Sequence, residues 1–285
     1  MSPVQTDLLN DLDPDGDFPL PPDLGSQGPA RIIAMCNQKG GVGKTTTTIN
    51  LAAALADYGR KVLIVDFDPQ GAASAGVGIN GMALERTLYD EMVSTKPDIT
   101  RIIHQTATPN LDIVPSNIEL SAAEIQLINE VAREQSLMRV LRPVVDSYDV
   151  IIVDCQPSLG LLTVNALTAA HGVMIPLEAE YFAMRGVALL VDQIERVQDR
   201  LNPQLRIDGV LLTMVDRRTI HAREVISTIR EQFGDAVFDT EIPRTVRFPD
   251  ATIAAEPITT YDPKSKGAES YRRLARELIS RGGSP

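Results

Sequence analysis

A glycine-rich loop between an apolar segment and a helix-compatible segment carries the clearest chemistry in this sequence. The apolar run Ile32–Cys36 is followed over residues 37–48 by N-Q-K-G-G-V-G-K-T-T-T-T. Glycines let successive backbone N–H groups point toward one anion, and the N-terminal end of a following helix adds positive potential. A strand, such a loop and a helix together are typical of a phosphate-binding loop.

Two lysines and a threonine in this loop are candidates for nucleotide chemistry. Lys44 can reach the terminal phosphates of a nucleotide, and the hydroxyl of Thr45 can bind Mg²⁺. Gln38 stands where the general pattern G-x-x-x-x-G-K-T has its first glycine, and Lys39 precedes Gly40. The additional lysine, Lys39, can therefore serve the nucleotide of its own chain or that of a neighbouring chain.

Two later apolar runs end in aspartates. Asp66 and Asp68 lie in V-D-F-D-P-Q-G, and Asp154 lies in V-D-C-Q-P. Because the carboxyl ends of parallel strands converge on one edge of a sheet, we expect these carboxylates to lie near the loop. A single Asp at a strand end usually forms a turn or caps a helix. The neighbouring phosphate-binding loop instead favours a magnesium site, with Asp154 the better ligand and Asp66 a second one, and a carboxylate that orients the attacking water.

Aliphatic runs alternate with helix-compatible segments from residue 31 onward. Near-continuous aliphatic strands separated by helices indicate a parallel sheet that is buried on both faces. The prediction is an α/β fold: a single P-loop NTPase domain with a mainly parallel twisted sheet covered by helices on both faces. Strands are expected at 32–36, 62–66, 111–114, 150–154, 173–176, 210–215 and near 237, helices at 45–58, 121–141, 161–170, 185–201, 221–233 and 267–280, and short helices or loops at 80–110.

Charge and composition divide the chain into two parts. The net charge is −11, and residues 1–30 contain six Asp and no Lys or Arg. We therefore predict a disordered acidic tail at 1–29 and one ATPase domain at 30–285. With 44% hydrophobic but only 4% aromatic residues, the core of that domain must be aliphatic. The acidic balance excludes a uniformly basic surface but leaves room for a local basic patch.

The sequence also suggests a compartment. Cys36 and Cys155 both fall in predicted buried strands, which suits a reducing cytoplasm and argues against a disulfide framework. No apolar run reaches the length of about 18 residues that a membrane-spanning helix needs, and the first residues lack the pattern of a secretory signal. A cytoplasmic protein without a membrane partner is the expectation.

Several motifs resemble one known family. N-Q-K-G-G-V-G-K-T-T-T, V-D-F-D-P-Q-G and V-D-C-Q-P-S-L-G are similar to the ParA/Soj partition ATPases, part of the deviant Walker A class that includes the MinD proteins. L-L-T-M-V-D-R-R-T at 211–219, I-P-R-T-V-R at 242–247 and Y-D-P-K-S-K-G-A-E at 261–269 match the family in the same order. The likeness covers residues 31–280.

The resemblance implies a role for each residue of the loop. Lys39 is similar to the family lysine that crosses an ATP-sandwiched homodimer to the phosphates of the partner subunit. Lys44 would bind the β- and γ-phosphates, Thr45 would bind Mg²⁺, and Thr46 would bind the α-phosphate. The remaining nucleotide-binding positions are Gly40, Gly41, Val42 and Gly43.

Other positions carry over from the later motifs. Asp68 matches the family position associated with hydrolysis, so the implied catalytic residues are Lys39, Lys44 and Asp68. Asp154 matches the Walker B carboxylate. Met214 and Pro243 fall where the family flanks the adenine ring. The implied cofactors are ATP and Mg²⁺.

The implied function is an ATP-dependent switch. The family forms a homodimer on ATP, binds double-stranded DNA without sequence preference, and segregates chromosomes or plasmids with a centromere-binding ParB-type protein that stimulates hydrolysis. Arg218 and Arg247 match the DNA-binding positions, and Arg217, Lys264 and Lys266 are weaker candidates for the same surface. Such a protein would be cytoplasmic and associated with the nucleoid.

Three other functions remain possible at this stage. One is a membrane-recruited positioning protein related to MinD, since residues 271–279 are basic and amphipathic. Another is an iron–sulfur reductase that holds a cluster between subunits, although both cysteines are expected on buried strands. The third is a ParA-like protein that positions a different cargo. The acidic tail could compete with DNA, recruit another factor, or be inert.

Overall fold

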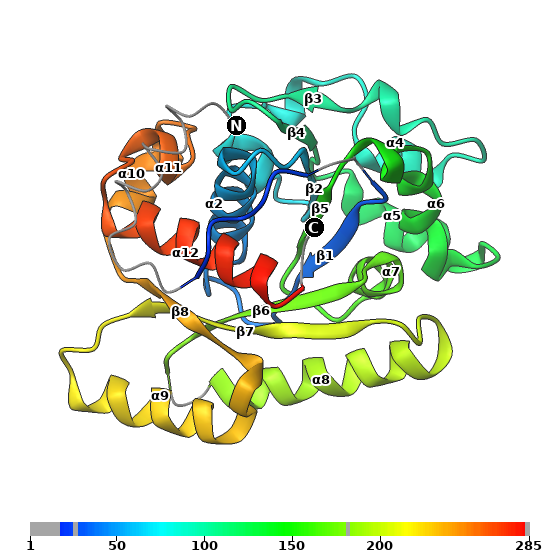
Figure 1. The fold of residues 1–285 in the computed structure, drawn as a ribbon. Helices are drawn as coiled ribbons and strands as arrows, with labels where there is room; N and C mark the ends of the chain where they lie inside the picture. The colour runs from blue at the N-terminus through cyan, green and yellow to red at the C-terminus, as the bar shows by residue number, and fades with distance from the viewer. Residues whose placement is uncertain (1–17, 25–27, 181–182, 283–285) are drawn as a thin grey trace.

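The computed structural model describes residues 18–24, 28–180 and 183–282, which form one eight-stranded sheet flanked by helices (Figure 1). The strand order is β3-β4-β2-β5-β1-β6-β7-β8. Every neighbouring pair is parallel except β3 and β4, which are antiparallel at one edge. The strands are β1 (Arg31–Met35), β2 (Val62–Phe67), β3 (His104–Gln105), β4 (Leu111–Val114), β5 (Val150–Cys155), β6 (Gly172–Glu178), β7 (Arg206–Val215) and β8 (Val237–Pro243).

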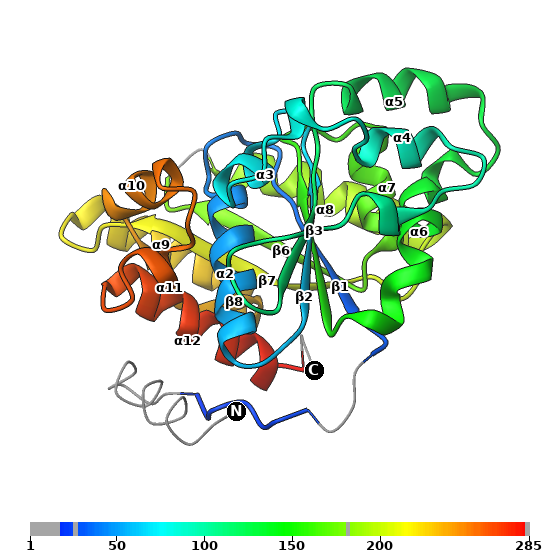
Figure 2. The same cartoon turned by 90° about the horizontal axis from the view of Figure 1, so that it is seen from above.

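Helices cover both faces of the sheet, with α2 and α12 on one side and α6 and α7 on the other (Figure 2). The fold class predicted from the sequence is confirmed. The helices are α2 (Lys44–Asp57), α3 (Ala72–Gly76), α4 (Leu88–Val93), α5 (Leu120–Gln126), α6 (Ser136–Leu141), α7 (Leu161–Ala169), α8 (Ala183–Arg200), α9 (Ile220–Phe233), α10 (Arg247–Ile253), α11 (Ile258–Tyr261) and α12 (Lys266–Ser280).

The alternation of side chains along each central strand produces two hydrophobic layers. In β1, Ile32 and Ala34 join the layer beneath α4 to α9, whereas Ile33 and Met35 join the layer beneath α2 and α12. All four are at most 4% exposed. A strand buried on both faces has no polar side, which is why these segments appear in the sequence as continuous aliphatic runs.

Two local predictions need correction. The long helix expected at 121–141 is wrong, because the segment breaks into α5, short 3₁₀ turns and α6. Glu130 is extended and Ala132 is left-handed at φ 54°, which an α-helix cannot accommodate. In addition, β3 was not predicted, since two residues carry no periodic pattern. The short helices or loops expected at 80–110 are present as α4, two 3₁₀ turns and the loops between them.

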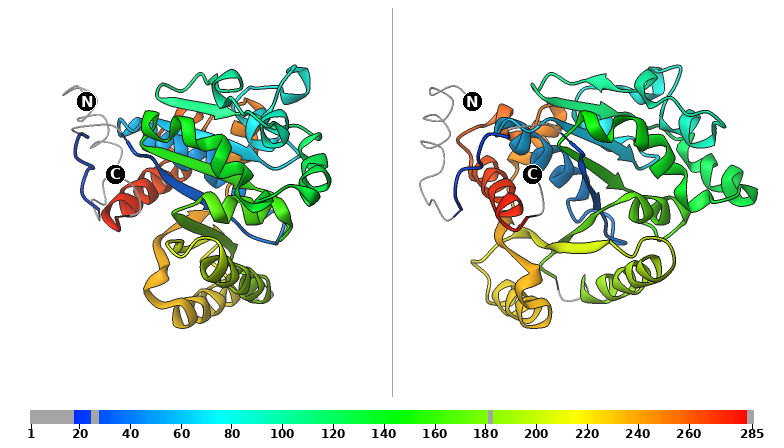
Figure 3. Two further views of the ribbon diagram at one scale, coloured as in Figure 1. Left: turned by 90° about the vertical axis from the view of Figure 1, so that its right-hand side faces the viewer. Right: turned by 45° about the vertical axis from the view of Figure 1, so that its right-hand side comes forward.

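Residues 18–24 lie against the domain beside α12 (Figure 3). The guanidinium of Arg60, in the turn between α2 and β2, donates a hydrogen bond of 2.9 Å to the carbonyl of Pro22. Leu20 packs on the hydrophobic layer beneath α2 and α12, and the guanidinium of Arg273 lies 5.4 Å from the ring centre of Phe18. The other residues of the predicted tail, 1–17 and 25–27, lie outside the described residues, together with 181–182 and 283–285.

The amphipathic segment in the last predicted helix is accounted for by packing. Leu274 and Leu278 of α12 are fully buried against the domain. Among the described residues, no helix has both the length and the apolar character needed to cross a membrane. The apolar side of α12 is therefore part of the core.

Candidate nucleotide-binding site

The carboxyl ends of three central strands bring the predicted residues to one edge of the sheet. Met35, which precedes the glycine-rich loop, pairs with Asp154 across β1 and β5, and Asp66 pairs with the same residue across β2 and β5. Asp66 and Asp154 are both fully buried. The convergence expected from a parallel sheet thus places both carboxylates next to the loop.

The loop has the open, glycine-dependent backbone that an anion site requires. Gly41 and Gly43 have φ angles of 77° and 86°, which side-chain-bearing residues rarely adopt. A Cβ atom added at Gly40 or Gly41 would meet nothing within 4 Å, so the space in front of their backbone is unfilled. α2 begins directly after Gly43, and its N-terminal end therefore faces that space.

Neighbouring strands hold the loop in place. The side-chain amide of Asn37 donates to the carbonyl of Pro176 at 2.7 Å, and its oxygen accepts the backbone N–H of Lys39 at 2.9 Å. The hydroxyl of Thr213 on β7 donates to the carbonyl of Val42 at 2.9 Å. These contacts tie the loop to β6 and β7.

Lys44 is buried in the loop with its ammonium turned inward. Nζ donates to the carbonyl of Lys39 at 3.2 Å. Burial lowers the pKa of Lys44, and the nearby carboxylate of Asp154 partly opposes that shift. A polyphosphate placed here would offset the cost of burying the ammonium, which fits the role predicted for this residue.

The residues predicted to bind magnesium form a compact set of oxygen donors. The Thr45 hydroxyl donates to Oδ2 of Asp154 at 2.7 Å, and the Thr48 hydroxyl donates to Oδ1 at 3.0 Å. Burial raises the pKa of Asp154 to about 7, and the charge of Asp66 adds to the shift. Hard oxygen donors of this kind suit Mg²⁺, which commonly completes its shell with phosphate oxygens and water. Within the described residues, no group of three or more His, Cys, Asp or Glu side chains is placed to hold a metal ion, so Mg²⁺ here would need ligands from phosphate and water.

Asp66 has protein partners that fix the segment after β2. Its Oδ2 accepts the backbone N–H of Ser74 at 2.7 Å and the Ser74 hydroxyl at 2.6 Å, while Oδ1 accepts the N–H of Asp68 at 3.3 Å. Burial raises the pKa of Asp66 to about 6. The structure shows these contacts with α3, and direct magnesium binding by Asp66 stays a prediction.

Asp68 is more accessible than the other two aspartates. It is half-buried in the turn that leads to α3, and Oδ1 accepts the backbone N–H of Gln70 at 3.0 Å. Within the described residues, Oδ2 accepts no hydrogen bond. A carboxylate oxygen in this position can accept a proton or orient a water molecule.

Lys39 points out of its own loop. Its ammonium lies 2.7 Å from Oε2 of Glu180 and 3.2 Å from Oε2 of Glu178, and 40% of its side chain is exposed. Glu178 also pairs with Arg244 at 2.9 Å. The hydrogen bond with Glu180 is the largest cause of the raised pKa of Lys39. Sequence reasoning missed both glutamates, because E-A-E at the end of a strand has no distinguishing pattern.

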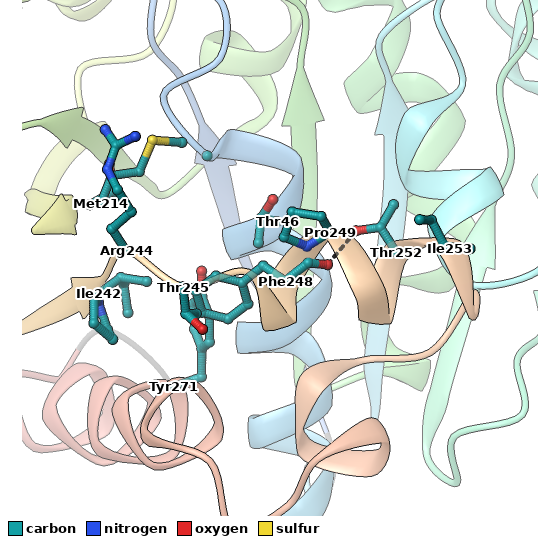
Figure 4. Close-up of a pocket in the computed structure, with 13 residues that line it drawn as sticks. Thr46, Met214, Ile242, Arg244, Thr245, Phe248, Pro249, Thr252, Ile253 and Tyr271 are labelled. Carbon is teal, nitrogen blue, oxygen red and sulfur yellow. Dashed lines mark hydrogen bonds between the residues drawn. The ribbon is translucent and has the colours of Figure 1, made fainter.

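A cavity of about 510 Å³ opens beside the loop between β7, β8, α10 and α12 (Figure 4). Met214 and Pro243, predicted to flank the adenine, both line it. Phe248 and Tyr271 also line the cavity, and their rings pack edge to face with their centroids 5.7 Å apart. These two aromatic side chains were not predicted. The cavity extends the phosphate-binding loop with an apolar site of the kind that a nucleobase fills.

The arginines predicted to bind DNA lie at the surface but have acidic neighbours. Arg218 is paired with Asp216 at 2.6 Å, and Arg247 lies 3.4 Å from a carboxylate oxygen of Asp262. Arg217 is likewise paired with Glu241. Lys264 and Lys266 are exposed. None of these contacts tests DNA binding, which stays a prediction for Arg218 and Arg247.

Comparison with known proteins identifies the family. Residues 30–207 match a family model described as an AAA domain. The chain is 49% identical over 252 residues to the sporulation initiation inhibitor protein Soj of Bacillus subtilis, covering 88% of this chain and 99% of that protein. This chain belongs to the ParA/Soj family of partition ATPases. It is also 45% identical over 258 residues to the chromosome partitioning protein ParA of Caulobacter vibrioides, with 90% and 96% of the two chains covered.

A solved structure places nucleotide in a homologue of this ParA-family protein. A Mycobacterium smegmatis protein named cobyrinic acid a,c-diamide synthase, with bound ADP and magnesium, is 37% identical and superposes with a TM-score of 0.79. The match covers 89% of this chain and 96% of that one. A plasmid partition protein of Borrelia burgdorferi, at 24% identity and a TM-score of 0.73, shares the fold.

Proposed function

We propose that this protein binds MgATP, dimerises around it, hydrolyses it to ADP and phosphate, and drives chromosome or plasmid segregation. The membership in the ParA/Soj family and the loop geometry support the nucleotide part of this proposal. The observation that supports a dimer is the position of Lys39, whose ammonium points away from its own loop and whose side chain is partly exposed. In two loops that face each other, this ammonium would reach the phosphates of the opposite nucleotide and offset their negative charge.

The residues of one chain divide the chemical work. Lys44 neutralises the terminal phosphates, and Thr45 with Asp154 would hold Mg²⁺. The metal, when bound, would neutralise charge that develops on the phosphate oxygens. Asp68 orients the attacking water. Its half-buried position leaves it open to bulk solvent in one chain alone, so water exclusion requires the dimer. We therefore expect a slow intrinsic rate, and the family resemblance implies that a ParB-type partner stimulates it.

The dimer is the form that we expect to bind DNA. Arg218 and Arg247 are each offset by an acidic neighbour, so one copy presents only a weak cationic surface. Two-fold symmetry doubles the number of phosphate contacts, which strengthens binding without sequence preference. Loss of the γ-phosphate removes part of the attraction across the interface and resets the dimer. We infer a cytoplasmic protein associated with the nucleoid.

The competing functions are less compatible with the structure. Cys36 and Cys155 are each 1% exposed, so neither can hold a cluster at a surface between subunits. The apolar side of α12 is buried in the core, so that side cannot insert into a lipid surface without partial unfolding. The structure is equally compatible with a ParA-like protein that positions another cargo, because that protein would use the same nucleotide switch.

Light scattering tests the dimer directly. The protein should have the mass of a monomer with ADP and of a dimer with MgATP, and Lys39→Ala should bind nucleotide but stay monomeric. Lys61→Ala, which removes a lysine stacked on Tyr148 away from the loop, is the matched control and should dimerise normally. An ATP-dependent dimer of Lys39→Ala would contradict the role of Lys39 across the interface.

A further inference from the structure

A second cavity lies at the other end of β1 from the glycine-rich loop and has no role in the function described so far. Its volume is about 590 Å³, comparable to that of the cavity beside the loop. It opens where β1 begins, with Ala30 and Ile32 in its wall, whereas the loop follows the end of β1. Figure 2 shows α6 and α7 beside β1, on the side away from α2. Leu141 of α6 and Ala169 of α7 complete this wall, and we call the space the β1 cavity.

The wall of the β1 cavity is apolar. Ala30, Ile32, Leu141 and Ala169 all line it, and each is at most 7% exposed. Met138 of α6 adds a more accessible apolar side chain that is 42% exposed. A concave apolar site of this size accommodates a small organic molecule, whereas a bare ion would leave the wall unfilled.

Two arginines bring positive charge to the same cavity. Arg139 and Arg142 are three residues apart in α6 and the 3₁₀ turn that continues it, so both lie on one side of this helical segment. Within the part of the chain that the structure describes, neither guanidinium has an ion pair or a hydrogen bond, and no Asp or Glu lines the cavity. In a chain of net charge −11, two arginines without acidic neighbours favour an anionic ligand.

The backbone around the β1 cavity gives an anion no help. The cavity receives the C-terminal ends of α6 and α7, where the helix dipole is negative. This differs from the glycine-rich loop, which the N-terminal end of α2 faces. Binding of an anion in the β1 cavity therefore depends on the two arginine side chains.

His171 adds a neutral hydrogen-bond donor to the cavity wall. Its Nδ1 accepts the backbone N–H of Ile32 at 2.9 Å, so the neutral ring carries its proton on Nε2. Partial burial lowers the pKa of His171, and the charge of Arg31 contributes to the shift. At neutral pH the ring is therefore uncharged and can donate one hydrogen bond from Nε2.

We propose that the β1 cavity binds a small organic acid with an apolar body and one anionic head group, either a carboxylate or a phosphate. The body would fill the space between Ile32, Leu141 and Ala169. The head group would accept paired hydrogen bonds from the guanidinium groups of Arg139 and Arg142. The proposal does not depend on the proposed function, because the two cavities share no described lining residue.

Isothermal titration calorimetry on the full chain tests this proposal. The probes are octanoate, octyl phosphate and the uncharged control octanol, each titrated in the presence of excess MgADP to keep the probe out of the nucleotide site. Octanoate or octyl phosphate should bind at one site per chain, and the tighter of the two identifies the head group. Octanol should bind at least about tenfold more weakly, because it lacks the charge that the arginines recognise.

Variants locate the site. Arg139→Gln with Arg142→Gln should weaken binding of the anionic probe by about tenfold or more. Met138→Asp, which places a negative charge at the cavity, should weaken it as well. The matched control is Arg196→Gln with Arg200→Gln, which removes the same charge from two exposed arginines of α8 and should bind the probe as the unaltered chain does.

Three results would overturn the proposal. One is the absence of saturable binding of both anionic probes, and another is octanol binding as tightly as they do. The third is an equal loss of binding in the α8 control, which would show a general charge effect. Failure of the chain to bind MgADP would instead refute the proposed function, and the comparison of the two double variants would still locate the probe.

Discussion

The ion pairs of Lys39 provide a quantitative prediction about dimerisation. Before Lys39 can reach the nucleotide of a partner subunit, its ammonium must leave Glu180 at 2.7 Å and Glu178 at 3.2 Å. Glu180 is 54% exposed, and an exposed pair of this kind stabilises by about 0.2–1 kcal/mol. Each dimer breaks two such pairs, so Glu180→Gln should lower the dissociation constant of the ATP dimer by about 2- to 30-fold.

Glu180 is a cleaner target than Glu178, because Glu178 also pairs with Arg244 and its loss would leave two cations side by side. Sedimentation velocity with MgATP over a range of protein concentrations measures the constant. The double variant Glu180→Gln with Lys39→Ala should stay monomeric, as Lys39→Ala alone does, because Glu180→Gln acts only by freeing Lys39. A weaker dimer in Glu180→Gln alone would refute the reasoning, because Glu180 would then stabilise the interface rather than compete with it.

Three further predictions concern the remaining site residues. Asp68→Ala should retain the ATP dimer while the turnover of ATP falls by about 10²–10⁴-fold; unchanged release of phosphate would remove Asp68 from the reaction. Because burial raises the pKa of Asp154 to about 7, protons should compete with Mg²⁺ and weaken magnesium-dependent nucleotide binding by up to about tenfold per pH unit below 7. The same raised pKa means that the contribution of Asp154 to the stability of the nucleotide-free fold is lost as pH rises from about 4 through 7. MgATP should therefore raise the melting temperature more at pH 8 than at pH 6, and an equal rise would contradict the assignment. Arg247→Glu should weaken binding of the ATP dimer to a DNA duplex by about tenfold and flatten its dependence on salt, with dimerisation unchanged in light scattering; intact affinity would exclude this surface.

The sequence predicts well those parts of the site that directly follow an aliphatic strand. The loop at 37–48 and the aspartates at the ends of β2 and β5 each follow an aliphatic strand, so parallel pairing alone brings them together. Met214 and Pro243 depended on the family resemblance, and both line the cavity. Local pattern and sheet topology were therefore sufficient for the loop and the aspartates, but not for Met214 and Pro243.

The parts that the sequence does not predict depend on distant contacts or local strain. Glu178 and Glu180 pair with Lys39 although about 140 residues of chain separate them, and no sequence pattern predicts a contact over that separation. Phe248 and Tyr271 come from two helices that only the folded domain brings together. The helix predicted at 121–141 failed because Ala132 adopts a conformation that alanine rarely takes. Tertiary packing overrides local helical propensity at that point.

The most direct test of the account is the binding of a non-specific DNA duplex in the presence of ATP or ADP, for the unaltered chain and Lys39→Ala in parallel. The account predicts tight binding with MgATP, weak binding with ADP, and weak binding of Lys39→Ala with either nucleotide. Equal binding in all four combinations would contradict a DNA-bound dimer that Lys39 closes around ATP.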